Sequence, residues 1–198
     1  MIAAVILAAG RSQRMGQPKM TLPWGETTVI GRVCEVLLGA GVAQQVVVTG
    51  GAHAEVVEAL ANIPVQVVFN GLFAQQEMLT SFQVGLRQLD EDIQAALVCL
   101  GDQPQIERRL VVRLMEEYEQ SGAGLIVPSY QMRRGHPWLL DRSYWQDVLA
   151  LEPAYSLRDF LNQHQSEIHY LAVDSRSVLL DLDTPEDYQK MRPDDTPG

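Results

Sequence analysis

Short apolar runs alternate with amphipathic stretches through the first half of the chain. Runs of aliphatic and β-branched residues bounded by small or polar residues are typical of buried strands, and they cover residues 2–7, 46–49, 65–69 and 95–100. Between them, apolar residues recur at helical spacing over residues 28–38, 53–61 and 77–89. This βαβα order predicts a mostly parallel sheet with helices on both faces, a Rossmann-like three-layer α/β/α fold.

The second half of the chain is less regular. Its pattern predicts helices over residues 107–120, 144–149 and 157–162 and strands over residues 124–128, 168–173 and 178–182. Thr184 and Pro185 mark the start of a C-terminal helix, because proline is favoured in the first turn. No linker or repeat divides the pattern, so we expect a single domain over residues 1–198 with a frayed polar tail over residues 192–198.

Four strand ends are expected to meet at one edge of the sheet. Ligands in folds of this kind bind beyond the carboxyl ends of the parallel strands. Leu7, Thr49, Asn70 and Leu100 end the four strands of the first half. The loops that follow these residues are therefore predicted to share a binding site.

Composition restricts the partners. The 198 residues carry a net charge of −10, with 46% hydrophobic and 20% charged residues, which is ordinary for a globular protein. An acidic chain is a poor match for nucleic acid or an anionic membrane, since both attract basic surfaces. No apolar run approaches the roughly 18 residues of a membrane span. The first strand begins without a basic leader, so we expect a cytoplasmic protein. Cys34 and Cys99 are expected to be buried free thiols.

The loop after the first strand departs from the acidic average. It contains Gly10 and Gly16 together with the cations Arg11, Arg14 and Lys19, and no acidic residue precedes it. Glycine allows backbone N–H groups to face an anion, and the cations add attraction. The loop is not a P-loop, which needs lysine directly after its last glycine, nor a dinucleotide loop, which needs three glycines. It still predicts a site for a polyanion, above all a nucleoside triphosphate.

Residues 7–19 read LAAGRSQRMGQPK, which resembles the signature L-A-A-G-x-S-x-R-M-G-x-x-K of the nucleotidyltransferases related to the molybdenum cofactor enzymes. The resemblance implies a fold of the nucleotide-diphospho-sugar transferase type, with this loop wrapped round the triphosphate and the lysine on its phosphates. The nucleotide-binding residues that it implies are Leu7, Ala8, Ala9, Gly10, Arg11, Ser12, Gly16, Lys19, Gly50, Asn70 and Ser81. An ordinary strand-to-helix loop with incidental arginines is the alternative interpretation.

Two groups of carboxylates are candidates for a metal site. Asp102 follows the fourth strand within Gly-Asp-Gln-Pro, and Mg²⁺ typically takes one or two protein carboxylates together with phosphate oxygens. Asp181 and Asp183 lie on one face of a predicted extended segment, and one of them is expected to share the metal with Asp102. The resembled family has metal-binding residues at both places. In the alternative interpretation, Asp102 caps the helix near Glu107 and Asp183 caps the last helix.

Two further segments match the family in part. Residues 70–81 resemble N-x-x-[WY]-x-x-G-M-x-x-S, a region that approaches the nucleoside, although Phe73 and Glu77 replace the usual residues and one residue is inserted. A basic turn in the second half matches a family segment that lies towards the acceptor, where it would hold a terminal phosphate or a pterin. The turn consists of Arg133, Arg134, Gly135 and His136. The alternatives are unliganded polar residues early in a helix and a solvated turn.

The resemblance implies a Mg²⁺-dependent enzyme that joins a nucleoside monophosphate from an NTP to the terminal phosphate of a molybdopterin-type acceptor and releases pyrophosphate. A phosphate monoester is largely ionised at neutral pH, so the reaction needs alignment and charge neutralisation rather than a general base. Catalytic roles fall to Arg14, Lys19 and Asp102. Residues 1–105 are expected to form the nucleotide-binding half and residues 106–191 the acceptor-binding half.

The Leu-Ala-Ala-Gly and Arg-Gly-His-Pro sequences look more like the cytidylyltransferases than the guanylyltransferases of the family, which favours CTP over GTP. The expected partners are the NTP, the acceptor and a molybdoenzyme that receives the product. Two other functions stay open. One is a sugar- or alcohol-phosphate nucleotidyltransferase, which shares the first loop, and the other is a non-catalytic chaperone that carries the cofactor.

Overall fold

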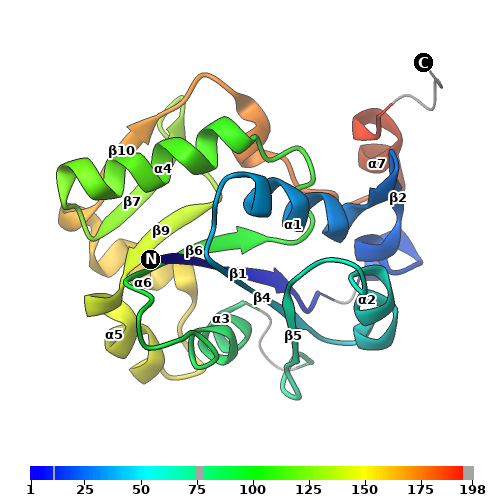
Figure 1. Ribbon diagram of the computed structural model, residues 1–198, viewed down its shortest axis with the longest axis horizontal. Coiled ribbons are helices and arrows are strands. Elements are labelled where there is room, and N and C mark those ends of the chain that lie inside the picture. The colour runs from blue at the N-terminus through cyan, green and yellow to red at the C-terminus, as the bar shows by residue number, and fades with distance from the viewer. Residues whose placement is uncertain (11, 75–77, 194–198) are drawn as a thin grey trace.

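The computed structural model describes residues 1–10, 12–74 and 78–193. The strands of its main sheet are β1 (Ile2–Ala8), β4 (Gln44–Thr49), β5 (Gln66–Phe69), β6 (Ala95–Leu100), β7 (Leu125–Tyr130), β8 (Arg133–Arg134), β9 (Trp138–Asp141) and β10 (His169–Ala172). They lie in the order β10-β7-β9-β6-β1-β4-β5, with β8 paired to β7 (Figure 1). Within this sheet, the described pairs that involve β9 or β8 are antiparallel and the others are parallel. The predicted mostly parallel sheet is confirmed.

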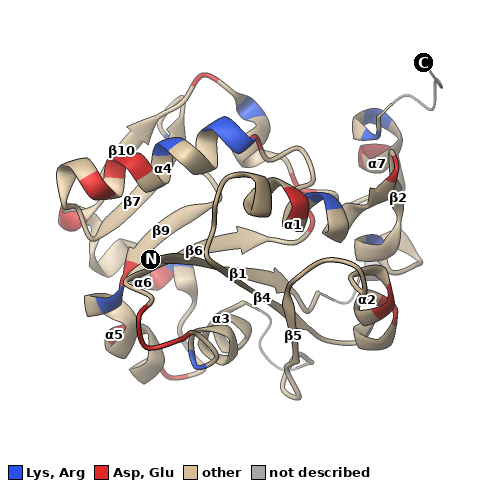
Figure 2. Cartoon of the chain, viewed as in Figure 1, with Lys and Arg blue, Asp and Glu red and all other residues tan. Residues whose placement is uncertain are grey.

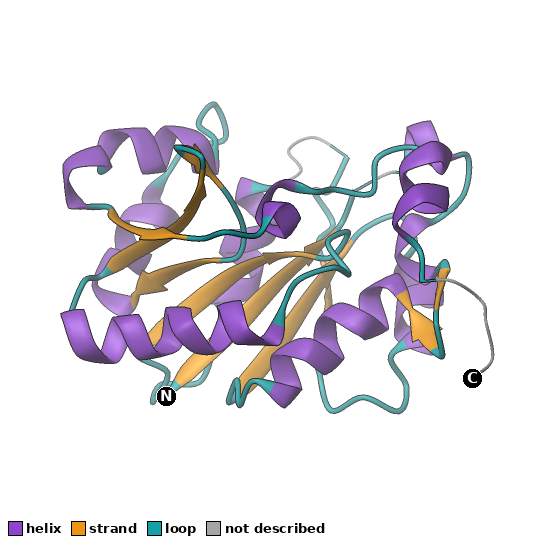
Figure 3. Ribbon diagram, turned by 90° about the horizontal axis from the view of Figure 1, so that it is seen from above, coloured by secondary structure: helices purple, strands orange, loops and turns teal. Residues whose placement is uncertain are grey.

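Helices cover both faces of this sheet (Figure 3). They are α1 (Val29–Gly39), α2 (His53–Ala59), α3 (Leu79–Leu86), α4 (Arg108–Ser121), α5 (Trp145–Ala150), α6 (Leu157–Gln163) and α7 (Pro185–Met191). Ala4 and Ile6 of β1 join an apolar cluster with α1, α2 and α4, whereas Ala3 and Val5 join a second cluster with α3, α5 and α6. Strands β1, β4 and β6 carry no charged residue (Figure 2). The three-layer fold predicted from the sequence is therefore confirmed.

Two expectations from composition also concern these elements. Cys34 and Cys99 are buried and free, as predicted, and burial raises the pKa of the Cys34 thiol to about 12. A thiol with a raised pKa is a poor nucleophile at neutral pH. None of the helices in the described part of the chain is long and apolar enough to cross a membrane.

The strand order reverses beside β1. The chain passes from β1 to β4 and β5 on one side, and then returns to β6, which pairs with β1 on the other side. Leu7 of β1 is in register with Leu100 of β6, so both strands end at the same level. The loops that leave these two ends diverge, and such a reversal creates a ligand crevice in open α/β sheets. This topology places the glycine-containing loop and Asp102 on the two sides of one crevice.

One predicted strand is wrong. The sequence predicts a strand over residues 178–182, but the structure has a 3₁₀ turn over Arg176–Leu179 followed by irregular chain. The backbone of this segment bonds to loops instead of to a strand. The carbonyl of Val178 accepts from the N–H of His136 at 3.0 Å, and the N–H of Leu182 donates to the carbonyl of Asp102 at 3.1 Å. Val178 and Leu182 of this segment are buried while Asp181 is exposed, which accounts for the alternation of apolar and polar residues.

Helix α7 holds the segment that precedes it against the first loop. Thr184 is the N-cap, and its hydroxyl accepts from the N–H of Asp187 in a capping box. Tyr188 of α7 packs against Trp24 of the small hairpin β2 (Pro23–Trp24) and β3 (Thr27–Thr28). Leu182 is buried in the same cluster. The carboxylates on either side of Leu182 are thereby brought to the crevice.

A tight hairpin positions the basic turn of the second half. Gln131 and Met132 connect β7 to β8, and their φ angles are 47° and 64°. Two positive φ angles are typical of the two-residue hairpin turn whose twist matches that of the flanking strands. Gly135 follows β8 at a close approach, because a Cβ there would lie 2.6 Å from the Cβ of Val178. This residue is needed for packing of the turn against the 3₁₀ segment.

Candidate functional site

A cleft opens beyond the carboxyl ends of β1 and β6. Its cavity has a volume of about 330 Å³ and is lined by the loops after both strands and by the segment before α7. The lining residues are Leu7, Ala9, Gly10, Ser12, Arg14, Lys19, Met20, Met78, Leu100, Asp102, Asp181 and Asp183. The structure thus brings the predicted catalytic residues and all three predicted metal carboxylates to one place.

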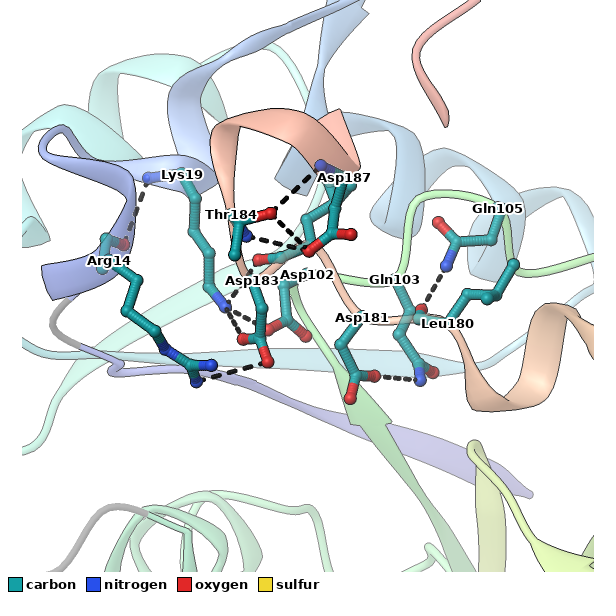
Figure 4. Close-up of polar contacts among 12 residues, drawn as sticks. Arg14, Lys19, Asp102, Gln103, Gln105, Leu180, Asp181, Asp183, Thr184 and Asp187 are labelled. Carbon is teal, nitrogen blue, oxygen red and sulfur yellow. Dashed lines mark hydrogen bonds and ion pairs between the residues drawn. The ribbon is translucent and has the colours of Figure 1, made fainter. Parts of the chain in front are cut away.

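Lys19 stands at the centre of the charged groups (Figure 4). Its ammonium forms an ion pair with Asp102, lies 3.5 Å from Oδ1 of Asp183, and donates to the carbonyl of Leu182 at 2.9 Å. The side chain is only 10% exposed. Buried charges need partners, and here those partners come from two distant segments, the turn after β6 and the chain before α7. Lys19 and Asp102 are therefore in direct contact.

Arg14 reaches the same carboxylates from the solvent side. Its guanidinium lies 3.2 Å from Oδ2 of Asp183, and its side chain is 71% exposed. An ion pair this exposed contributes little to stability. The guanidinium is consequently available to an anion that enters the cleft.

The loop between β1 and Lys19 is shaped by its small residues. Ser12 adopts a left-handed conformation with φ of 50°, and its hydroxyl accepts from the backbone N–H of Lys19 at 3.2 Å. Gly16 is also left-handed, with φ of 68°, and a Cβ at Gly10 would meet no atom within 4 Å. The loop therefore leaves space on its cleft side. Arg11, a predicted nucleotide-binding residue, lies outside the described residues.

Asp181 is held by a neutral donor. The side-chain amide of Gln103 donates to Oδ1 of Asp181 at 2.7 Å (Figure 4). Partial desolvation raises the pKa of Asp181, and the carboxylates of Asp102 and Asp183 raise it further, while the bond from Gln103 opposes the shift. Three carboxylates are thus close enough to repel one another, which a cation in the cleft would relieve.

The alternative capping roles of the carboxylates do not agree with the structure. Helix α4 has Glu107 as its N-cap, with no side-chain cap bond, so Asp102 does not cap it. Helix α7 is capped by Thr184 rather than by Asp183. Both aspartates instead face Lys19 in the cleft.

Some predicted nucleotide-binding residues lie behind the cavity lining. Ala8 and Gly50 are buried, and a Cβ at Gly50 would lie 2.5 Å from the carbonyl of Ala9. Asn70 and Ser81 are also buried, and the Asn70 amide donates to the Ser81 hydroxyl at 3.0 Å. These residues support the loops around the cleft. Gly16 lines a neighbouring cavity of about 420 Å³ between the first loop and the start of α2.

Another cavity of about 680 Å³, hereafter the second cavity, adjoins the cleft, since Met78 lines both. Its polar lining includes Arg133, Arg134 and Arg158, and no acidic side chain of the described residues lines it. The guanidinium of Arg134 is held in place, because it donates to Tyr170 at 2.9 Å and to Asn162 at 2.8 Å. The predicted acceptor turn therefore forms one wall of an electropositive cavity.

Two members of the predicted acceptor turn differ from expectation. Burial lowers the pKa of His136 to about 4, so its imidazole is neutral at neutral pH and adds no positive charge to the turn. Gly135 packs against Val178 and is not part of the cavity lining. The positive charge of the turn thus comes from its two arginines.

The carboxylates of the cleft are the donors available to a divalent cation. The described residues contain no group of three or more His, Cys, Asp or Glu side chains arranged to hold a metal. Carboxylates nevertheless converge on the ammonium of Lys19, which already places a positive charge among them. These oxygens fit a Mg²⁺ ion held by one or two carboxylates and completed by phosphate oxygens and water.

Comparison with known proteins identifies the family. Residues 4–168 match the family model described as a MobA-like NTP transferase domain. The chain belongs to the MobA-like NTP transferase family. The matched residues of this NTP transferase include the first loop and Asp102, and they end before the segment that carries Asp181 and Asp183.

Curated relatives cover this transferase almost from end to end. It is 26% identical to the molybdenum cofactor cytidylyltransferase of Escherichia coli, over 94% of this chain and 93% of that one. A probable molybdenum cofactor guanylyltransferase of Bacillus mycoides is 25% identical over 97% and 96%. The nicotine blue oxidoreductase of Paenarthrobacter nicotinovorans is 30% identical over 96% of each chain.

Solved structures agree on the fold. Rv0371c of Mycobacterium tuberculosis superposes with a TM-score of 0.84 at 30% identity, covering 96% of this chain and 95% of that one, and it has also been solved as a manganese complex. A nucleotidyl transferase of Methanothermobacter gives a TM-score of 0.81 at 27% identity over 97% and 96%. The fold is that of the nucleotide-diphospho-sugar transferases, and the protein is a nucleotidyltransferase.

Two residues of the site were not predicted. Gln103 belongs to the Gly-Asp-Gln-Pro motif, but nothing in the sequence shows that its amide reaches a carboxylate nearly eighty positions further along. Arg158 lines the second cavity from the start of α6. The signal for Arg158 is weak, because a lone arginine early in a helix is ordinary.

Proposed function

We propose that this enzyme transfers a nucleoside monophosphate from an NTP, with CTP favoured, to the terminal phosphate of a molybdopterin-type acceptor and releases pyrophosphate. The observation that carries the proposal is the arrangement of the two cavities. A cleft with Lys19, Arg14 and three carboxylates adjoins an electropositive cavity with three arginines. Such a pair suits two phosphorylated substrates that must be brought into line.

The first cleft suits the triphosphate. Lys19 and Arg14 would neutralise the charge of the triphosphate and the charge that builds on the departing pyrophosphate. Preorganised positive charges of this kind stabilise the transition state at the position where negative charge develops. To reach a phosphate, the ammonium of Lys19 has to exchange Asp102 and Asp183 for a new anionic partner. Asp102, with Asp181 or Asp183, would hold a Mg²⁺ ion, which supplies further charge neutralisation at the phosphates.

The second cavity suits the acceptor. Arg133, Arg134 and Arg158 would hold its terminal phosphate, since one guanidinium group can donate two parallel hydrogen bonds to two phosphate oxygens. The neutral His136 beside them offers hydrogen bonds to an uncharged ring such as a pterin. The nucleophile is an ionised phosphate oxygen, so no side chain has to remove a proton. Residues 1–105 would bind the nucleotide and residues 106–191 the acceptor.

The choice of CTP rests on the Leu-Ala-Ala-Gly and Arg-Gly-His-Pro sequences. The relatives named as cytidylyltransferase and guanylyltransferase share 26% and 25% of their residues with this chain, so these identities do not separate the two bases. We place the reaction in the cytoplasm, with a molybdoenzyme as receiver of the product. Hydride transfer, suggested by the name of one relative, is less suited to a cleft built from a lysine, an arginine and carboxylates.

Pyrophosphate release tests the proposal. CTP, GTP, ATP and UTP are each supplied with Mg²⁺ and with molybdopterin-type cofactor, sugar phosphates or alcohol phosphates. We expect release only with the molybdopterin-type acceptor, and fastest with CTP. Turnover with a sugar or alcohol phosphate would instead support the related transferase, and cofactor binding without any release would support a chaperone. Reduction of a substrate by a nicotinamide or flavin cofactor would contradict the proposal altogether.

A further inference from the structure

Two neutral side chains hold the guanidinium of Arg134, which lines the second cavity from β8. Its Nε donates to the hydroxyl of Tyr170 at 2.9 Å, and its Nη1 donates to Oδ1 of Asn162 at 2.8 Å. Tyr170 belongs to β10 and Asn162 to α6, so three separate elements meet at this guanidinium. The Tyr170 ring also lies close, with 5.8 Å between its centroid and Cζ of Arg134. These contacts restrict the orientation of the arginine side chain.

Strand β7 places the donor and the acceptor of the Nε bond on the same face of the sheet. Arg134 of β8 is in register with Ser129, and Tyr170 of β10 is in register with Val127. Val127 and Ser129 are two positions apart on one strand, so their side chains lie on the same face. Residues directly opposite each other in neighbouring strands share a face. The contact between Tyr170 and Arg134 is therefore set by the sheet itself.

Neither partner neutralises the charge of Arg134. A tyrosine hydroxyl and an amide oxygen are uncharged, and no carboxylate of the described residues forms an ion pair with this guanidinium. A guanidinium has five N–H donors, so the two bonds leave three of them for a ligand. The other two arginines of the cavity, Arg133 and Arg158, are exposed and have no side-chain hydrogen bond within the described part of the chain. Arg134 is thus the arginine of the cavity whose direction is fixed before a ligand arrives.

We propose that Tyr170 is a positioning residue that orients Arg134 to receive the phosphate of the acceptor. Tyr170 is not part of the cavity lining, so it acts through Arg134, whereas Asn162 lines the cavity and can also meet the acceptor directly. The inference rests on the proposed function, because it needs a phosphorylated acceptor in the second cavity. Ordering one flexible side chain on binding costs about two- to tenfold in affinity, and the bond from Arg134 to Tyr170 removes that cost in advance.

The first test removes only the hydroxyl that accepts from Arg134. Tyr170→Phe keeps the aromatic ring, and the pyrophosphate assay measures KM for each substrate. We expect KM for the molybdopterin-type acceptor to rise about five- to tenfold, with KM for CTP unchanged and kcat at saturating acceptor within about twofold of the wild type. A general loss of structure would change both KM values and kcat. Thermal melting of the variant shows that it is folded.

The chain provides a matched control for this hydroxyl. Tyr155 is exposed to a similar extent, 45% against 43% for Tyr170, and it lies outside the lining of the second cavity. Its hydroxyl makes no contact with Arg134. Tyr155→Phe should therefore change neither KM by more than about twofold. A rise in the acceptor KM of this control equal to that of Tyr170→Phe would overturn the specific role of Tyr170.

A second test needs no turnover. The N–H resonance of Arg134 Nε is followed by nuclear magnetic resonance during titration with phenyl phosphate, and it is assigned as the signal that is missing in Arg134→Met. Because this resonance reports on the second cavity, phosphate bound at Lys19 does not obscure it. We expect phenyl phosphate to shift the resonance in the wild type. In Tyr170→Phe, the concentration at half-maximal shift should rise about five- to tenfold.

A double-mutant cycle separates action through Arg134 from any other effect. If Tyr170 acts through Arg134, then Tyr170→Phe adds no further rise in the acceptor KM to that of Arg134→Met. Additive losses, or wild-type KM and phenyl phosphate affinity in Tyr170→Phe, would overturn the positioning role and leave the proposed function intact. Failure of the wild type to release pyrophosphate with any acceptor would instead overturn the proposed function, while the phenyl phosphate titration still decides whether Tyr170 orients Arg134 for a phosphate.

Discussion

Lys19→Ala is expected to lower kcat/KM by at least about a hundredfold, which corresponds to about 2.7 kcal/mol of lost transition-state stabilisation. The ammonium is the buried cation of the cleft, and it contacts carboxylates from both of the other segments that form the site. Removing the ammonium leaves the negative charge that develops on the departing pyrophosphate without this positive neighbour. Steady-state pyrophosphate release with saturating acceptor measures the effect.

The sequence contains a matched control for Lys19. Lys190 is the only other lysine of the chain, and it is exposed on α7. Lys190→Ala should keep kcat/KM close to that of the wild type. Because Lys19→Ala leaves Asp102 without its ion-pair partner, thermal melting of the variant must show that it is still folded. Activity near that of the wild type in a folded Lys19→Ala protein contradicts the role given to this residue.

Asp102→Ala is expected to lower kcat/KM by a similar factor of at least about a hundredfold. Asp102 sits where β6 ends, beside the end of β1, so it is the carboxylate most firmly placed by the sheet. Without it, the proposed Mg²⁺ loses one of its two protein ligands. The same pyrophosphate assay, run over a range of Mg²⁺ concentrations, measures the loss.

Asp102→Asn refines this test, because it keeps the size of the side chain and removes its charge. A transferase should lose turnover in this variant. A carrier protein should bind the cofactor as before and show no turnover in either form. Asp92→Ala, at an exposed acidic position before β6, is the control that removes one negative charge elsewhere. Full activity of Asp102→Asn would count against a metal-binding role for this carboxylate.

The sequence was sufficient to predict how Lys19 and Asp102 come together. Their elements are short, apolar and separated by amphipathic stretches, so a parallel sheet was the natural outcome. Once the strand ends were expected at one rim, the loop after residue 8 and the turn after residue 100 had to be neighbours. The prediction succeeded because local patterns, rather than details of packing, decide these positions.

The segment before α7 shows where pattern reading fails. Its alternation of apolar and acidic residues is that of a half-buried strand, yet its backbone bonds to the turn after β6 and to the basic turn. The hydrogen bond from Gln103 to Asp181 could not be predicted for the same reason, since it joins two loops. Periodicity predicts which strand ends are neighbours, but it carries no information on how an irregular segment outside the sheet contacts their loops.

The basic turn shows a second limit. The sequence places His136 in a basic turn with its arginine neighbours, but burial lowers the pKa of its imidazole and keeps it neutral at neutral pH. For Gly135, the structure shows a packing role, because its missing Cβ makes room for Val178. In both cases the residue type fits a ligand and a packed core equally well, and only the surroundings decide.

We propose that one cleft, built on Lys19 and Asp102, binds an NTP together with a divalent cation. The most direct measurement is the melting temperature of the wild-type protein with CTP alone, Mg²⁺ alone and both together, because a ligand that binds only the folded form raises it. We predict a larger rise with CTP and Mg²⁺ together than the two separate rises combined, and its loss in Lys19→Ala. An unchanged melting temperature with CTP and Mg²⁺, or the same rise in Lys19→Ala, would contradict the account.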